Sequence, residues 1–339
     1  MSLGRLISSW DAEHLLALAT SGYDRAVVLR VDGTPEKSNL NFYPAYPVLV
    51  RWLANVPGLN EFRSALLVTF VAGAIAAWGV CELGARLSGD RRIGVVMALL
   101  WGVAPGSVVL QMAYSEALFA AFAAWALVAI VEENWLTAVP LIGAASLVRN
   151  TGFALVAAIS LAALCAIIRG SAGWRPWLSV AIAPLTGLGY LGFVAARTHR
   201  IDGWVWLQDK AWGLRFDGGE GTVADVWHYL GHDGNVYYTL CSVSVIVSAL
   251  LFFWSLGVRL PLSLHLYTAC VLVAAVGTDG FFNSKPRLIL LAFHRGLPAG
   301  PSCCMYAHPR THDMCACACR LLRMVRHLCH DHHRREPIA

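Results

Sequence analysis

Long apolar segments follow one another through most of this chain of 339 residues. Hydrophobic residues make up 57% of the chain and charged residues only 14%, whereas about a quarter of an ordinary soluble domain is charged. Because a helix needs about 20 apolar residues to cross a bilayer, the sequence predicts an all-α, polytopic transmembrane helix bundle with about eight or nine membrane segments. The expected segments are 62–86, 92–110, 115–131, 135–149, 151–168, 174–196, 236–257, 262–279 and one that starts near Leu288.

The segments 135–149 and 151–168 are short and meet at the sequence VRNTG. They could be two short spans, or one hairpin that does not fully cross the membrane.

Arginine in the short connections orients the predicted bundle. Three connections carry it: Arg86 with Arg91 and Arg92, Arg169 with Arg175, and Arg259. Threading the spans alternately places all three on one side, which their positive charge identifies as cytoplasmic. Residues 1–61, expected to be an extracytoplasmic loop with short helices, and the outer loop 198–235 then lie on the opposite side. We therefore expect extracytoplasmic loops, carried by a bundle of residues 62–293, to form the site.

Carboxylates at the outer ends of helices are the first candidate site residues. Asp11 begins a short apolar helix, where it could act as a general base or only as an N-cap or first-turn acid. Glu13 and His14 are candidates for substrate hydrogen bonds or for a metal, although one D-x-E pair offers few oxygen ligands for a hard cation. Glu116 starts a span. An acid there suits a helix N-terminus, and an ionisable group at membrane depth is also a functional candidate.

Basic residues on the outer side form a second group of candidates. Arg149, Lys285 and Arg287 would suit the phosphate of a lipid carrier, because both side-chain types bind phosphate oxygens. They could equally extend from helix ends along the membrane interface. Asn150 follows Arg149 at a helix break formed with Gly152, where a sugar or phosphate could approach the backbone.

Tryptophan is frequent in the outer loop. Its members are Trp204, Trp206, Trp212 and Trp227. Such residues are typical of an interfacial aromatic belt. With Gln208, Asp209 and Lys210 between them, they also suit one wall of a sugar-binding site.

A series of short motifs occurs in one order: WDAEH, GYD, FYPAYPVLVRWL, AYSEALFA, RNTGF, WLQDKAW and SKPRLIL. Over about residues 8–293, this series resembles the PIG-V-like mannosyltransferases, relatives of GPI mannosyltransferase 2. The resemblance implies a GT-C type membrane glycosyltransferase. Such an enzyme would transfer mannose from a polyprenyl-phosphate or dolichyl-phosphate carrier to an extracytoplasmic acceptor, such as a glycolipid.

The resemblance also implies roles for the candidate residues. Asp11 and Glu13 would be catalytic. The substrate-binding residues would be His14, Glu116, Arg149, Asn150, Gln208, Lys210, Lys285 and Arg287. No residue is assigned to a metal and no cofactor is assigned, although the use of a divalent metal stays open.

The implied partners are a lipid-linked sugar donor, a glycolipid or glycan acceptor and membrane lipids. Nucleic acid is not among them, because residues 1–293 carry 19 basic against 18 acidic residues and so offer no general basic surface. The implied location is multi-pass, in the plasma membrane of a bacterium or the endoplasmic reticulum membrane of a eukaryote. The active site would face away from the cytoplasm.

Both ends of the chain depart from the family pattern. A first span normally precedes the WD motif, whereas Met1 lies nine residues before Trp10. The tail 294–339 loses helical periodicity and is rich in Arg, His, Cys and Pro, which is typical of disorder or of a reading frame shifted near codons 292–296. Its C-x-C-x-C run at Cys315 lacks the spacing of structural zinc sites.

Two other functions fit the same composition. A membrane transporter would place ionisable residues near the bilayer midplane and often contains two related halves. Here the polar residues gather on one side, and no internal repeat is evident. The chain could also be a truncated, non-functional version of the glycosyltransferase that lacks its first and last spans.

Overall fold

A computed structural model describes residues 9–170, 173–232, 235–258 and 260–292 of the chain. The predictions for Arg259 and for the tail 294–339 lie outside these residues. The described part is built almost entirely from helices. Its one sheet pairs β1 (Arg215–Phe216) with β2 (Thr278–Asp279) in antiparallel register. The prediction of an all-α fold is confirmed.

Helix α6 (Glu116–Val131) forms the centre of the bundle, and most of its residues are buried. It is apolar on every side and rich in alanine, which is typical of a helix surrounded by other helices. Small residues let neighbouring helices approach closely. At Gly79 of α4 (Glu61–Ser88), an added Cβ would lie 2.9 Å from the Cβ of Ala124. Helix α4 therefore packs along α6, and α5 (Arg91–Gly102) packs on α4 as well.

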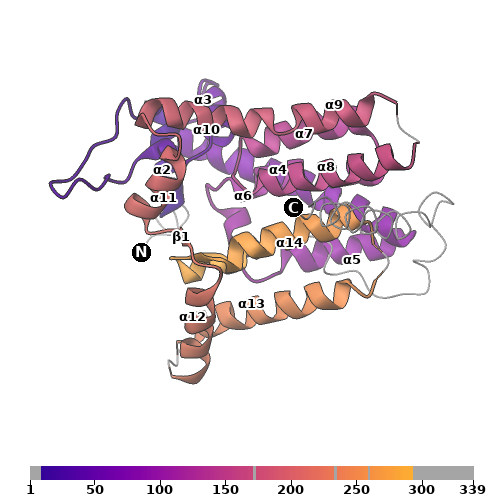
Figure 1. Ribbon diagram of the computed structural model, residues 1–339. Helices are drawn as coiled ribbons and strands as arrows, with labels where there is room; N and C mark the ends of the chain where they lie inside the picture. Colours follow the sequence, from indigo (N-terminus) through magenta and orange to yellow (C-terminus); the bar gives the residue numbers. More distant parts are fainter. Residues whose placement is uncertain (1–8, 171–172, 233–234, 259, 293–339) are drawn as a thin grey trace, which may run out of the picture.

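Further helices lie around this centre. They are α7 (Trp135–Ser146), α8 (Gly152–Ile168), α9 (Arg175–Ile182), α10 (Leu185–Thr198), α13 (Val236–Ser255) and α14 (Leu262–Val276). Helix α7 packs on α6, and α8 packs on both α14 and α9. Figure 1 shows the long helices running roughly alongside one another, with α9 and α10 at one edge of the bundle and α13 at the opposite edge.

Three segments of the described structure are long and apolar enough to cross a membrane: Glu61–Ser88, Arg175–Thr198 and Val236–Ser255. Helices α6, α7, α8 and α14 are shorter but also apolar. This pattern is that of an integral membrane protein, as the composition predicts.

The predicted span 92–110 is not one continuous helix. Helix α5 ends at Gly102, and a short 3-10 helix, η2 (Ser107–Gln111), follows. Pro105 and Gly106 lie between the two, and Gly106 has a left-handed backbone with φ of 92°. Proline and a left-handed glycine both end helices, so the chain turns here instead of continuing across the bundle.

The predicted pair of spans around VRNTG is two separate helices, because a turn at residues 147–151 divides α7 from α8. The first residue of α8, Gly152, is packed so tightly against the backbone of Ser146 that no side chain would fit there. The predicted span 174–196 also divides, into α9 and α10, with Pro184 at the junction.

Charged groups mark one end of the bundle at the C-termini of α4, α6 and α8. Arg86 forms ion pairs with Glu82 and Glu132. Arg169 Nη2 lies 2.6 Å from Glu133 Oε1. The arginine-bearing turns after α4 and α8 therefore lie at the same end of the molecule (Figure 1).

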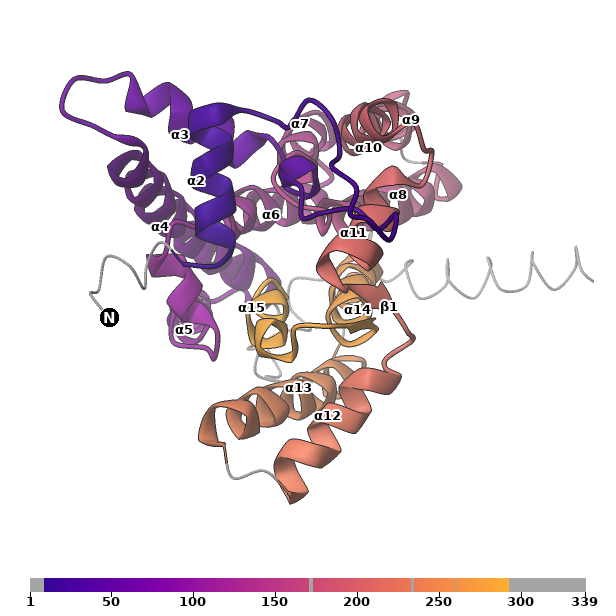
Figure 2. The same cartoon turned by 90° about the vertical axis from the view of Figure 1, so that its left-hand side faces the viewer.

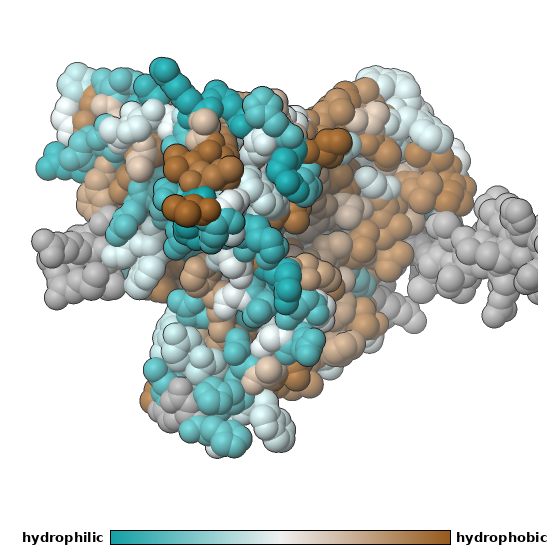
Figure 3. All heavy atoms as spheres, turned by 60° about the vertical axis from the view of Figure 1, so that its left-hand side comes forward, coloured by the Kyte–Doolittle hydropathy of each residue, from teal (hydrophilic) through white to brown (hydrophobic). Residues whose placement is uncertain are grey.

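The opposite end carries three helices that the sequence places outside the bundle: α2 (Asp11–Ser21), α11 (Gly203–Trp212) and α12 (Glu220–Gly231). Figure 2 views the molecule from this end, where α2, α11 and α12 lie in front of the bundle helices. Hydrophilic side chains gather over this end, and hydrophobic surface covers the sides of the helices behind it (Figure 3). The stretch 198–235, predicted to be an outer loop, thus contains two helices, α11 and α12.

Candidate active site

Helix α2 brings Asp11 to the polar end of the bundle. Its buried apolar residues recur at helical spacing and fix the helix against its neighbours: Ala12, Leu15, Leu18 and Ala19. The N-cap position belongs to Trp10, whose side chain makes no capping hydrogen bond. Asp11 is therefore a first-turn residue and not the N-cap.

Two carboxylates and two guanidinium groups meet at this end, and we call them the charged cluster: Asp11, Glu116, Arg149 and Arg287. Arg287 Nη1 lies 2.6 Å from Asp11 Oδ2 and 3.7 Å from Glu116 Oε1. Arg149 Nη1 lies 2.8 Å from the same oxygen of Glu116. The cluster joins four segments that are far apart in the sequence.

Glu116 is the most buried member of the charged cluster, with 1% of its side chain exposed. It lies in the first turn of α6, where the helix N-terminus favours an acid. A buried carboxylate is costly unless it is paired, and two arginines face this one. Arg149 also donates a hydrogen bond to Ser115 Oγ at 3.2 Å, which ties the α7–α8 turn to the start of α6.

Arg287 lies on a short helix, α15 (Lys285–Ile289), that the rest of the bundle positions. A Cβ added at Gly106 would lie 2.8 Å from the backbone nitrogen of Arg287, so the turn after α5 packs directly on α15. The Arg287 guanidinium stands over the ring of Tyr114, 5.5 Å from its centroid. Burial alone would lower the pKa of Arg287. The negative charges of Asp11 and Glu116 raise it by more than burial lowers it, so the net shift of the pKa is upward.

Lys285 is not part of the charged cluster, although it is two residues away on the same helix. Its side chain is buried, and Nζ donates to the carbonyls of Thr278 at 2.7 Å and Ala275 at 3.2 Å. Burial lowers the pKa of Lys285, and nearby aspartates oppose that shift in part. These contacts fasten α15 to the end of α14.

His14 lies one turn after Asp11, in an aromatic group. Its ring stacks on Phe42 at 5.3 Å and meets the edge of Trp212 at 4.8 Å. Lys37 Nζ lies 4.9 Å from the centre of the Trp212 ring. Burial lowers the pKa of His14 more than the neighbouring acids raise it, so the imidazole is held neutral near pH 7.

The other predicted residues lie apart from the charged cluster. Glu13 and Asn150 are exposed. Lys210 Nζ pairs with Asp209 Oδ2 at 2.9 Å, and Gln208 is half-buried on the same helix. These four residues remain candidates for contact with a bound substrate.

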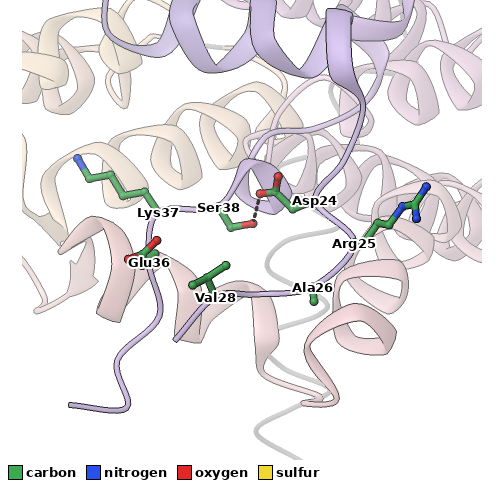
Figure 4. Close-up of a pocket in the computed structure, with 7 residues that line it drawn as sticks. All are labelled: Asp24, Arg25, Ala26, Val28, Glu36, Lys37 and Ser38. Atoms are coloured by element: carbon green, nitrogen blue, oxygen red, sulfur yellow. Dashed lines mark hydrogen bonds between the residues drawn. The ribbon is translucent and has the colours of Figure 1, made fainter. Parts of the chain in front are cut away.

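A shallow hollow of about 300 Å³ lies between the two arms of the loop 24–38. Figure 4 shows a hydrogen bond from Ser38 to Asp24 across it, with an oxygen-to-oxygen distance of 2.8 Å. Lys37 and Arg25 extend away from each other on opposite sides (Figure 4). The charged groups of this hollow therefore do not converge on a common ligand.

The described residues contain no group of three or more His, Cys, Asp or Glu side chains that could hold a metal ion. The two acids of the charged cluster face arginines instead.

Comparison with known proteins bears on the family of this chain. No family model matches it. Over 123 residues it is 33% identical to "GPI alpha-1,6-mannosyltransferase 2" of Cricetulus griseus, a match that covers 34% of this chain and 23% of that protein. With the Homo sapiens protein of the same name it is 30% identical over 159 residues, or 44% of this chain and 30% of that protein. The chain is related to the PIG-V-like mannosyltransferases.

This PIG-V-like chain also has a solved structural neighbour, ArnT from Cupriavidus metallidurans, whose crystal structure was determined bound to undecaprenyl phosphate. The TM-score is 0.50 over 88% of this chain and 55% of ArnT, at 14% identity. The likeness confirms the GT-C-like membrane fold. The matches with the curated relatives span between 23% and 30% of those proteins.

Tyr114 and Ser115 contact the charged cluster, and sequence reasoning missed both. Tyr114 packs its ring on Arg287, and its hydroxyl donates to the carbonyl of Ser9 at 3.3 Å. Both residues stand directly before Glu116 in the motif AYSEAL, so their position beside a candidate acid was the available signal.

Proposed function

We propose that this chain transfers mannose from a polyprenyl-phosphate or dolichyl-phosphate carrier to a hydroxyl group of an extracytoplasmic acceptor, such as a glycolipid. The observation that carries the proposal is the charged cluster at the polar end of the bundle, in which the first-turn Asp11 pairs with Arg287 and the buried Glu116 pairs with Arg149. The names of the sequence relatives support mannose transfer, and the lipid bound to ArnT supports a polyprenyl-phosphate donor.

In this reaction the acceptor oxygen attacks C1 of mannose, and the bond from C1 to the phosphate oxygen breaks. Asp11 takes the proton of the acceptor hydroxyl as general base. Arg287 and Arg149 bind the phosphate, and their positive charge stabilises the negative charge that develops as the carrier leaves. Glu116 holds both arginines in place.

The Asp11–Arg287 contact gives the reaction an order. In the structure, Arg287 Nη1 lies 2.6 Å from the carboxylate that must act as the base. A carrier phosphate competes for Arg287 and so releases Asp11 to accept a proton. The base becomes available when the donor is bound.

The remaining predicted residues take secondary roles. His14 and Glu13 follow Asp11 on α2 and contact the acceptor, as do Gln208 and Lys210 on α11. Lys285 positions α15, because its ammonium group already has two carbonyl partners. The site faces away from the cytoplasm, on the side opposite the arginine-bearing turns.

Membranes that contain the full chain, supplied with radiolabelled mannosyl phosphopolyprenol, test this function. Label should pass to a lipid or glycan fraction. Asp11→Asn should reduce the rate by about a hundredfold or more, because an amide cannot take the proton. Glu13→Gln should cause a smaller loss. Asp32→Asn, a change at an exposed acid, should leave the rate unchanged. Near-normal transfer by Asp11→Asn would remove Asp11 as the base.

A further inference from the structure

A second hollow, of about 280 Å³ and as open as the first, lies where the α7–α8 turn meets α10 and α11, and we call it the cavity. Its polar lining residues are Tyr43, Asn150, Asp202 and Trp204, and Phe153 and Leu191 are among the apolar ones. Arg149 belongs to the charged cluster, and the next residue along the chain, Asn150, lines this cavity. The two sites are therefore neighbours.

Two residues of this cavity carry buried polar atoms without a partner in the described part of the chain. They are Tyr43, whose side chain is 5% exposed, and Trp204. The hydroxyl of Tyr43 and Nε1 of Trp204 each make no hydrogen bond there. Burying a polar group without a partner costs stability, so each such group needs an explanation. A ligand that forms a hydrogen bond with each of these two groups would be such an explanation.

The neighbouring Tyr190 differs from Tyr43, because its hydroxyl has hydrogen-bond partners in the protein. Its ring centroid lies 4.3 Å from that of Tyr43. Its hydroxyl contacts the carbonyls of Leu40 at 2.8 Å and Phe42 at 2.7 Å. These bonds hold the backbone directly before Tyr43. Among the described residues, the Tyr43 hydroxyl has no such partner.

We propose that this cavity binds one hexopyranose ring of the acceptor glycan. Naming the ring as part of the acceptor rests on the proposed function. A pyranose has an apolar C–H face that packs on aromatic rings and a rim of hydroxyls that need hydrogen bonds. Tyr43, Trp204, Asn150 and Asp202 supply donors and acceptors for that rim. A hydrocarbon chain would fill the same volume and leave the buried polar atoms unpaired.

The full chain in lipid nanodiscs, titrated with methyl α-D-mannopyranoside and methyl α-D-glucopyranoside, tests the cavity by saturation-transfer NMR. Tyr43→Phe and Trp204→Phe keep a ring and remove the polar atom. Each should weaken binding by about fivefold, the effect of one hydrogen bond. Tyr43→Phe should not lower the melting temperature, because the hydroxyl that it removes has no partner in the described part of the chain. Trp204→Phe also removes one ring of the indole, so a moderate loss of melting temperature from weaker packing is expected there.

Two matched variants control the test. Trp227→Phe changes an exposed tryptophan on α12 and should bind both glycosides like the unsubstituted chain. Tyr190→Phe removes a hydroxyl that contacts two carbonyls and should lower the melting temperature.

Three outcomes would overturn the sugar subsite. They are no binding of either glycoside, unchanged binding by Tyr43→Phe and Trp204→Phe, and tighter binding of unglycosylated polyprenyl phosphate by those variants. The mannose-transfer assay, run on the same samples, separates this result from the proposed function. Transfer without glycoside binding would refute the subsite alone. Glycoside binding that depends on Tyr43 and Trp204, without transfer, would refute the transferase and leave a sugar-binding cavity.

Discussion

Arg287 is the residue on which the charged cluster depends most, because its guanidinium reaches both carboxylates. Those acids raise its pKa despite burial, so it stays a cation at every pH at which the protein is folded. A phosphate that enters the site therefore meets a fixed positive charge. If Arg287 is replaced by a neutral residue, Asp11 and Glu116 lose this positively charged partner.

Replacing Arg287 by Gln should raise the KM for the lipid-linked donor at least about tenfold, since charge-assisted hydrogen bonds to phosphate are strong. It also leaves buried Glu116 with one arginine, so part of the loss will be structural. Arg287→Lys keeps the charge and should fold, but a lysine lacks the forked geometry and should still weaken donor use. Arg63→Gln, at an exposed arginine, is the control. Donor saturation that is unchanged in both Arg287 variants would contradict the phosphate role.

Lys285 gives a pH dependence of stability with a defined sign. Burial lowers its pKa in the folded chain, so between that value and the ordinary lysine pKa of about 10.4 the unfolded chain binds more protons. The free energy of unfolding should therefore rise with pH in that alkaline window. Lys285→Met should remove this contribution, and melting curves from about pH 8 to 10 compare the two chains. An identical slope in both would exclude Lys285 as its source.

At the scale of elements, the predicted spans agree with the structure where an apolar run is long and unbroken, as in α4, α6, α8 and α13. They fail at 92–110, where hydropathy stays high across residues that end helices. The predicted span 174–196 matches the apolar segment Arg175–Thr198, although a turn at Pro184 divides its helix. Pro105 with Gly106, and Pro184, were visible signals that a window of averaged hydropathy does not register.

Gly106 links two of these elements and should not tolerate a side chain. Alanine at its left-handed backbone costs about 1 to 2 kcal/mol, and its Cβ would lie 2.7 Å from the carbonyl carbon of Pro286. Gly106→Ala should lower the melting temperature and displace α15, which reduces transfer as well. Gly102→Ala, in α5 with no atom near the added Cβ, should instead stabilise the chain by up to about 1 kcal/mol. Equal effects of the two substitutions would contradict this packing.

At the scale of the whole molecule, the sequence predicts the end of the bundle at which a polar residue lies. It predicts less well which of these residues contact one another. Asp11, Glu116, Arg149 and Arg287 could be grouped because all four stand at helix ends on one side. Lys285 lies outside this cluster because its side chain binds carbonyls at the end of α14. The spacing of residues along the chain does not reveal this contact between α15 and α14. The cavity at Tyr43 likewise arises only from the packing of distant segments.

Cysteine labelling tests the orientation of the whole molecule. Gly231 and Gly173 are exposed positions with space for a side chain, at the polar end and in an arginine-bearing turn respectively. A membrane-impermeant maleimide applied from outside should label Gly231→Cys above the level of the unsubstituted chain. It should not label Gly173→Cys, because positive loops stay in the cytoplasm. The reverse pattern would move the site to the cytoplasmic side.

The length of the central helix has a consequence for the depth of the charged cluster. Helix α6 has 16 residues and is therefore about 24 Å long, whereas the hydrocarbon core of a bilayer measures about 30 Å. Glu116 begins it, and ion-paired Glu132 and Glu133 follow its last turn. Other helices, and not lipid, surround α6, so this difference in length is taken up inside the protein: at least one charged end of α6 lies below the level of the headgroups. A carrier phosphate that reaches Glu116 and its two arginines therefore has to enter between the helices of the bundle.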